Sequence, residues 1–155
     1  MLSGIKNSWR VGLSRGCDEM DKKEISGIRL YLDKTQGQMA SLLGVSLKAI
    51  QSFEQGWREI PTHIERQTLF LLAMKTSLRE KAKRCWGTLK CPMETRRNCP
   101  AWEFRAGHLC WFINGTICQG GIQQSWRKKM EICRRCVVFQ DMVPSLRGMT
   151  KELPS

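Results

Sequence analysis

The sequence predicts a mainly helical protein in two parts, in which amphipathic helices precede a small, irregular segment rich in cysteine. Two observations lead to this prediction. Apolar residues recur at helical spacing between residues 24 and 80. Seven of the eight cysteines come later, between Cys85 and Cys136. A chain of 155 residues is long enough for two small domains of this kind.

The first helix is predicted over residues 24–33, whose apolar face consists of Ile25, Ile28 and Leu32. Residues 1–23 show no comparable period, so we interpret them as an N-terminal extension with a composition compatible with disorder. Met20 opens the patterned sequence and is a candidate for the natural start.

The second helix is predicted to begin after Thr35. Thr35 and Gln38 have the spacing of a capping box, in which each side chain satisfies an otherwise unpaired backbone amide. Gly44 supplies the left-handed residue that ends many helices. The apolar face between these signals consists of Met39, Ala40, Leu42 and Leu43.

Two further helices follow. Ser46 is expected to cap the third helix, which carries Ile50 and Phe53 and ends near Gly56. Pro61 suits the first turn of a fourth helix. We expect this helix to run towards Lys83 as a linker, with an apolar stripe made of Ile64, Phe70, Leu71 and Met74.

The second and third helices have the spacing of a helix-turn-helix, which binds duplex DNA through one helix. The motif needs a small residue where its helices approach, a residue tolerant of positive φ in the turn, and apolar residues inside. The small residue is Ala40, the turn residue is Gly44, and the apolar residues inside are Val45 and Ile50. With Gln36, this spacing resembles the Cro/C1-type (XRE) helix-turn-helix family of repressors.

The resemblance implies a lambda-repressor-like DNA-binding domain over residues 24–80, acting on double-stranded DNA as a homodimer. It also implies an ion pair between Arg29 and Glu54, which would tie the first helix to the end of the third. The recognition helix would run from Ser46 to Gln55. The residues expected to contact DNA are Thr35, Gln36, Ser46, Leu47, Lys48, Gln51 and Ser52.

The cysteine-rich segment, residues 84–139, has few aliphatic residues for a core, so metal or cross-links are expected to hold it. Eight ligands, with His108 as the eighth, would fill two zinc sites, whereas four cysteines would hold one iron–sulfur cluster. The pattern leaves both cofactors open. The candidate ligands are Cys85, Cys91, Cys99, Cys110, Cys118, Cys133 and Cys136, of which only the last two have the spacing of a zinc knuckle.

Two Cys-Trp pairs, at residues 85–86 and 110–111, and the sequence Cys133-Arg-Arg-Cys136 make this segment similar to the two-CW cysteine-rich domain of bacterial regulators and sensors. The resemblance implies a sensory or structural module. We also expect a short helix over residues 125–135 whose basic start is solvated, and a C-terminal tail over residues 140–155. The tryptophans expected around the metal are Trp86, Trp102, Trp111 and Trp126.

The net charge of +12 indicates a polyanionic partner, of which nucleic acid is the first candidate. The charge is unevenly placed. Residues 24–80 hold seven Lys/Arg and six Asp/Glu, whereas residues 81–139 hold twelve Lys/Arg and three Asp/Glu. The excess in the cysteine-rich segment would either contact DNA phosphates or offset cysteine thiolates.

The hypothesis from the sequence is therefore a bacterial, sequence-specific transcription regulator whose cysteine-rich module binds metal and either stabilises the protein or transmits redox state to the DNA-binding domain. The alternative is a metal-binding adaptor whose helical domain contacts other proteins. No phosphate loop, metalloprotease motif or nucleophile elbow is present, so we expect no enzymatic activity. Without an apolar signal or a membrane span, we expect a cytoplasmic, nucleoid-associated protein.

Overall fold

The computed structural model describes residues 19–76 and 83–143, which form a mainly helical protein. The first half contains four helices: α1 (Lys22–Tyr31), α2 (Gln36–Leu43), α3 (Leu47–Gln55) and α4 (Thr62–Lys75). The second half contains short helices around a two-stranded hairpin. These elements are α5 (Cys85–Thr88), α6 (Met93–Arg97), α7 (Pro100–Glu103), the 3-10 helix η3 (Cys110–Phe112), β1 (Thr116–Cys118), β2 (Gly121–Gln123), α8 (Trp126–Cys133) and α9 (Val137–Met142).

The ends of the first helices follow from the local sequence. Asp21 caps α1, and its carboxylate accepts from the amides of Lys23 and Glu24. Thr35 and Gln38 form the predicted capping box at the start of α2. The predicted left-handed residue Gly44 ends that helix with φ at 66°.

The buried face of α2 differs from the prediction at Leu42. Met39, Ala40 and Leu43 are buried on the side of α2 that packs against α3 and α4, but the side chain of Leu42 is 49% exposed. The three buried positions are one, three and four residues apart and therefore lie on the same side of the helix. Leu42 lies outside that face, so its inclusion in the core was wrong.

The predicted stripe on α4 was right at Ile64 but wrong at Met74, and the expected length of that helix was wrong. Met74 is 40% exposed, and Phe70 and Leu71 are only half-buried. The helix ends at Lys75, with the extended residue Thr76 after it, so it does not continue into the segment 77–82, which lies outside the described residues. The buried positions of α4 are Ile64, Glu65, Thr68, Leu69, Leu72 and Ala73.

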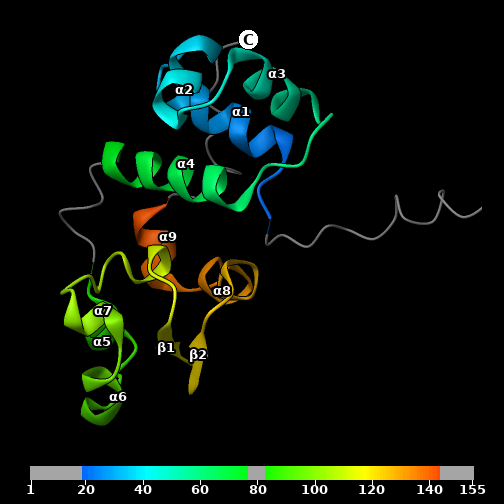
Figure 1. Ribbon diagram of the computed structural model, residues 1–155. Helices are drawn as coiled ribbons and strands as arrows, with labels where there is room; N and C mark the ends of the chain where they lie inside the picture. The colour runs from blue at the N-terminus through cyan, green and yellow to red at the C-terminus, as the bar shows by residue number, and fades with distance from the viewer. Residues whose placement is uncertain (1–18, 77–82, 144–155) are drawn as a thin grey trace, which may run out of the picture.

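The two halves of the chain share one core. Figure 1 shows α4 between the α1–α3 group and the cysteine-rich half. The buried side chains Trp111, Trp126, Met130 and Phe139 belong to the same apolar cluster as the interior of α1–α4. Helix α9 also runs past the predicted boundary at residue 139, and Met142 is fully buried. The packed structure therefore extends into the predicted tail as far as residue 143.

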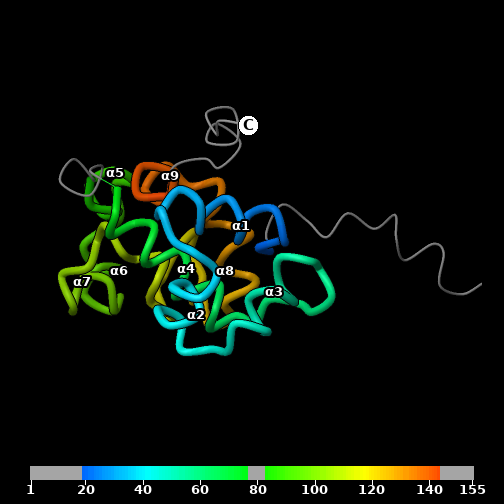
Figure 2. The backbone as a smooth tube through the Cα atoms, turned by 90° about the horizontal axis from the view of Figure 1, so that it is seen from above, coloured from blue at the N-terminus to red at the C-terminus, as the bar shows by residue number. Residues whose placement is uncertain are grey.

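The arrangement separates α3 from the short helices of the cysteine-rich half. Seen from above, α3 lies at one end of the molecule and α5, α6 and α7 lie at the other (Figure 2). Figure 1 gives the same separation from the side. A DNA duplex lying against α3 would consequently be remote from α5–α7.

The cysteine-rich half contains a hairpin that was not predicted from the sequence. Residues of its strand β1 and of its turn lie beside residues of α5 and α7. Strands β1 and β2 pair antiparallel, with Ile117 opposite Ile122. The turn residues Gln119 and Gly120 have φ angles of 52° and 77°, as a tight two-residue hairpin requires. This turn fixes the position of Cys118 at the end of β1.

Candidate nucleic-acid interface and cysteine cavity

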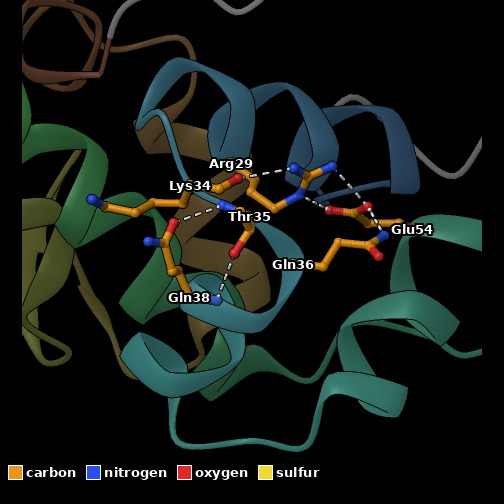
Figure 3. Close-up of polar contacts among 6 residues, drawn as sticks. All are labelled: Arg29, Lys34, Thr35, Gln36, Gln38 and Glu54. Atoms are coloured by element: carbon orange, nitrogen blue, oxygen red, sulfur yellow. Dashed lines mark hydrogen bonds and ion pairs between the residues drawn. The ribbon is translucent and has the colours of Figure 1, made fainter.

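Arg29, Glu54 and Gln36 form a network that joins α1, α2 and α3 (Figure 3). The Arg29 Nε donates to Glu54 Oε1 over 2.5 Å, and Nη2 donates to Oε2 over 3.1 Å. Gln36 Nε2 donates to the same Oε2 over 2.7 Å. The remaining Arg29 nitrogen, Nη1, donates to the carbonyl of Lys34 over 2.9 Å. The ion pair expected from the sequence is therefore present and joins α1 to α3, and the hydrogen bond of Gln36 joins α2 to α3.

The network also determines the charge state of Glu54. Burial by itself would raise the pKa of this carboxyl, but hydrogen bonds from Arg29 and Gln36 and the positive charge of Arg29 outweigh burial and lower it. Glu54 is consequently a charged group at neutral pH whose interactions depend on the folded structure.

The N-terminal part of α3 presents polar and apolar groups to solvent. Ser46 caps the helix, and its hydroxyl accepts from the amide of Ala49 over 3.1 Å. Leu47, Lys48 and Gln51 are all exposed. These three side chains are available to a ligand along α3, as the sequence analysis expected.

Ser52 does not belong to this exposed face. Its side chain is 9% exposed, and its hydroxyl donates to the carbonyl of Lys48 over 2.8 Å. Position 52 lies on the turn of α3 that faces the interior, beside Phe53. The expectation that Ser52 contacts DNA is therefore corrected.

Two residues at the start of α2 that were predicted to contact DNA, Thr35 and Gln36, form hydrogen bonds within the protein. The Thr35 hydroxyl accepts from the Gln38 amide over 3.1 Å, and the Gln36 amide nitrogen is held by Glu54. The Thr35 hydroxyl hydrogen can still be donated to a ligand, because capping uses only the oxygen. Gln36 retains its carbonyl oxygen and one amide hydrogen.

The segment after α3 adds exposed groups that the sequence analysis missed. Trp57 is 77% exposed directly after Gly56, and the exposed Arg58 follows. These residues could have been found from the sequence. The signal is a large aromatic residue beside a cationic residue, directly after the predicted recognition helix.

Five of the seven candidate metal ligands surround one cavity of about 340 Å³ at the far end from α3. Cys85 begins α5, Cys99 precedes α7, and Cys110 begins η3. Cys91 lies between α5 and α6, and Cys118 ends β1. The hairpin and three short helices thus bring together cysteines spaced over 34 positions of the sequence.

The other two candidate ligands lie elsewhere. Cys133 ends α8 within the shared core, and Cys136 precedes α9. The seven cysteines therefore do not converge on a single point. Within the described residues, no three His, Cys, Asp or Glu side chains are grouped so as to hold one metal ion.

The thiols of Cys85 and Cys110 share a hydrogen bond that shifts their pKa values apart. This bond is the main reason that the pKa of Cys85 falls to about 7 and that of Cys110 rises. Burial raises the pKa of Cys118, and the charge of Lys129 opposes part of that rise. Burial likewise raises the pKa of Cys133 to about 12.

Lys129 is a functional candidate that sequence reasoning missed. The residues at the start of α8 were expected to form a solvated face, but Trp126 and Lys129 are buried, the latter at 1% exposure. The Lys129 ammonium donates to the hydroxyl of Thr116, a residue that lines the cavity. The next residue towards the N-terminus, Lys128, is exposed.

The four tryptophans divide between two environments. Trp86 and Trp102 line the cavity and pack edge to face, with ring centroids 4.9 Å apart. Trp111 and Trp126 instead lie in the core between the two halves of the protein. The four tryptophans therefore do not share one cavity, and Trp111 and Trp126 belong to the cluster that contains Cys133.

Arg134, inside the Cys133-Arg-Arg-Cys136 sequence, links the cysteine-rich half to the α1–α4 half. Its guanidinium pairs with Glu24 on α1 over 2.8 Å and with Glu65 on α4 over 3.0 Å. A second link runs from Arg66 on α4 to the carbonyl of Phe112, over 2.8 Å. The sequence analysis considered only the thiols of this tetrapeptide.

Comparison with protein families, with curated proteins and with solved structures gave no match to this chain. Among the described residues, no helix is both long enough and apolar enough to cross a lipid bilayer.

Proposed function

We propose that this protein is a sequence-specific DNA-binding transcription regulator that reads duplex DNA with α3. The observation that carries the proposal is the exposed row of Leu47, Lys48 and Gln51 on a helix held at a defined angle by the Arg29–Glu54–Gln36 network. A helix presented in this way fits the major groove.

The chemistry of the exposed row suits base edges and phosphates. Lys48 can donate to guanine or to a phosphate, Gln51 can pair with adenine, and Leu47 can contact the methyl group of thymine. The hydroxyls of Thr35 and Ser46, with Gln36, lie where phosphate contacts would set the register. By resemblance to lambda-repressor-like proteins, the reader would act as a dimer on an inverted repeat.

We further propose that the cysteine-rich half binds a metal cofactor, zinc or an iron–sulfur cluster, and reports its redox state to the reader. The contacts that support this role are those of Arg134 with Glu24 and Glu65. They join the segment between Cys133 and Cys136 directly to α1 and α4.

The experiment that tests DNA binding is a titration of a mixed-sequence duplex at several salt concentrations. Each phosphate contact releases counterions, so affinity should fall steeply and linearly in a double-logarithmic plot. Selection from a random pool should then yield an enriched site. Absent or salt-independent binding would contradict the proposal.

A second candidate function is a metal-binding adaptor that uses the helical half for protein contacts. The exposed side chains of Leu42, Leu47 and Trp57 favour this alternative, because exposed apolar groups suit a protein interface. The same titration discriminates between the two functions. An adaptor would not bind duplex DNA, whereas a regulator would bind it and bury Leu47 in the groove.

A further inference from the structure

The cavity between α5, α7 and β1 is lined by thiols and by cationic or neutral groups. Besides its five cysteines, it contains the guanidinium of Arg96, which donates to the carbonyls of Cys91 and Trp86 over 2.7 and 3.2 Å. No carboxylate of the described residues lines it. Arg96 is thus the one charged side chain other than the thiols among the described residues that line the cavity.

Lys129 supplies a second positive charge behind the cavity wall. Its ammonium is buried and bonded to the Thr116 hydroxyl, and no carboxylate of the described residues forms an ion pair with it. Thr116 itself lines the cavity, so the ammonium lies one side chain away from it. A buried ammonium without a counter-charge is costly, so an anion in the cavity would remove that cost.

The positions of the thiols favour a large anionic group over one metal ion. A single zinc ion needs four donors about 2.3 Å from one point, which puts sulfurs about 3.8 Å apart. No three cysteines of the described residues gather around such a point. They are instead distributed around about 340 Å³ of space, as a cofactor with several metal ions requires.

The five thiols around this space differ in burial and in partners. Cys99 and Cys110 are buried, whereas Cys85, Cys91 and Cys118 are half-buried. The sulfur of Cys91 hydrogen-bonds the carbonyl of Pro92 over 3.8 Å at an exposed position.

We propose that this cavity holds a polynuclear iron–sulfur cluster, that Lys129 is its buried counter-charge, and that its ligands are Cys85, Cys99, Cys110 and Cys118. Four cysteine thiolates are the usual ligand set of such clusters, and each thiol gives up its proton on binding. The inference rests on the metal-binding part of the proposed function and selects one of its two cofactors.

The first test is the metal content of the full chain after expression with iron and purification without oxygen. We expect iron and acid-labile sulfide in equal amounts, about two or four of each per chain, and a brown colour. Zinc without sulfide, or a colourless protein with disulfides among these cysteines, would overturn the proposal.

Cysteine variants test the ligand assignment. Cys99→Ser and Cys118→Ser should lose most of the iron and sulfide, because serine preserves the shape but not the thiolate. Cys136→Ser, whose sulfur does not line the cavity, should keep both. Two different ligand variants are used so that misfolding of one, checked by circular dichroism, leaves the other informative. Equal cluster content in all three would contradict the assignment.

Lys129→Met tests the counter-charge, with Lys128→Met as a control that removes the same charge from an exposed position of α8. Without the Lys129 charge, the reduction potential should become more negative, and a chelator should remove the iron at least about tenfold faster. The cluster-free variant should fold as stably as the parent, because a buried charge has been removed. Identical behaviour of the two variants would refute a counter-charge at position 129.

These measurements need no DNA and are independent of the reader. An intact cluster in a protein that binds no duplex would contradict DNA binding alone. Salt-dependent duplex binding by a protein without iron would contradict the cluster alone.

Discussion

The guanidinium of Arg134 donates to Glu65 on α4 over 3.0 Å and thereby joins the two halves of the protein. Glu65 is 4% exposed, and burial raises its pKa despite the opposing hydrogen bond and charge of Arg134. Arg134 lies next to Cys133, so the contact joins that end of α8 to a buried carboxylate of the α1–α4 half. Two further contacts link the halves, Arg134 with Glu24 and Arg66 with the Phe112 carbonyl, each over 2.8 Å.

Arg134→Met is expected to lower the free energy of unfolding by about 3 kcal/mol, because it leaves Glu65 buried without its partner. Urea unfolding at neutral pH measures this loss. The neighbouring Arg135 is exposed, so Arg135→Met is a control expected to stay within about 0.5 kcal/mol. Similar losses in both variants would show that Arg134 has no special structural role.

Gln51→Ala is expected to weaken binding to a selected operator by about 1–3 kcal/mol and to leave random duplex almost unaffected, because the amide would read a base. Fluorescence anisotropy with both duplexes at one salt concentration gives the comparison. Gln55→Ala, at the exposed end of α3, should change neither affinity. If Gln51→Ala weakens both duplexes equally, Gln51 reads no base.

The contribution of Glu54 to stability should depend on pH. Its folded-state pKa lies below the ordinary value of 4.5, so the folded protein binds this proton less tightly than the unfolded chain. The stabilisation is therefore fully present above pH 4.5 and is lost as the pH falls through the lowered pKa.

Glu54→Gln tests this pH dependence, because glutamine resembles the protonated carboxyl. The variant should be less stable than the parent at pH 6, and the difference should shrink as the pH falls below 4.5. Denaturant unfolding at a series of pH values measures the difference. A gap that stays constant down to low pH would mean that Glu54 does not titrate as described.

Alanine variants of the adjacent residues Leu42 and Leu43 test which side of α2 is buried. Leu43→Ala should cost about 2–5 kcal/mol, because it leaves a cavity in the core, whereas Leu42→Ala should cost less than about 0.5 kcal/mol. Thermal or urea unfolding measures the loss of unfolding free energy in each variant. If Leu42→Ala proves the more destabilising, Leu42 belongs to the buried face of α2, as the sequence predicted.

Much of the first half was predictable because its signals are local. The capping box of Thr35 and Gln38, the left-handed Gly44 and the cap at Ser46 each depend on residues within one helical turn. Predictions failed where burial depends on distant partners. The stripe on α4 was misplaced because that helix packs on two groups of elements, and one period cannot describe two contact faces.

The sequence by itself determined the ends of α2 and α3, the Arg29–Glu54 pair and the inventory of thiols. It placed the first helix over residues 24–33, whereas α1 spans Lys22–Tyr31 because Asp21 caps it. Only the tertiary structure decided which thiols meet, because Cys85, Cys99, Cys110 and Cys118 come from four elements with no shared period. It also decided that Lys129 is buried while Lys128 is exposed. Adjacent residues of a helix point about 100° apart, so their surroundings depend on which side of α8 the rest of the chain covers.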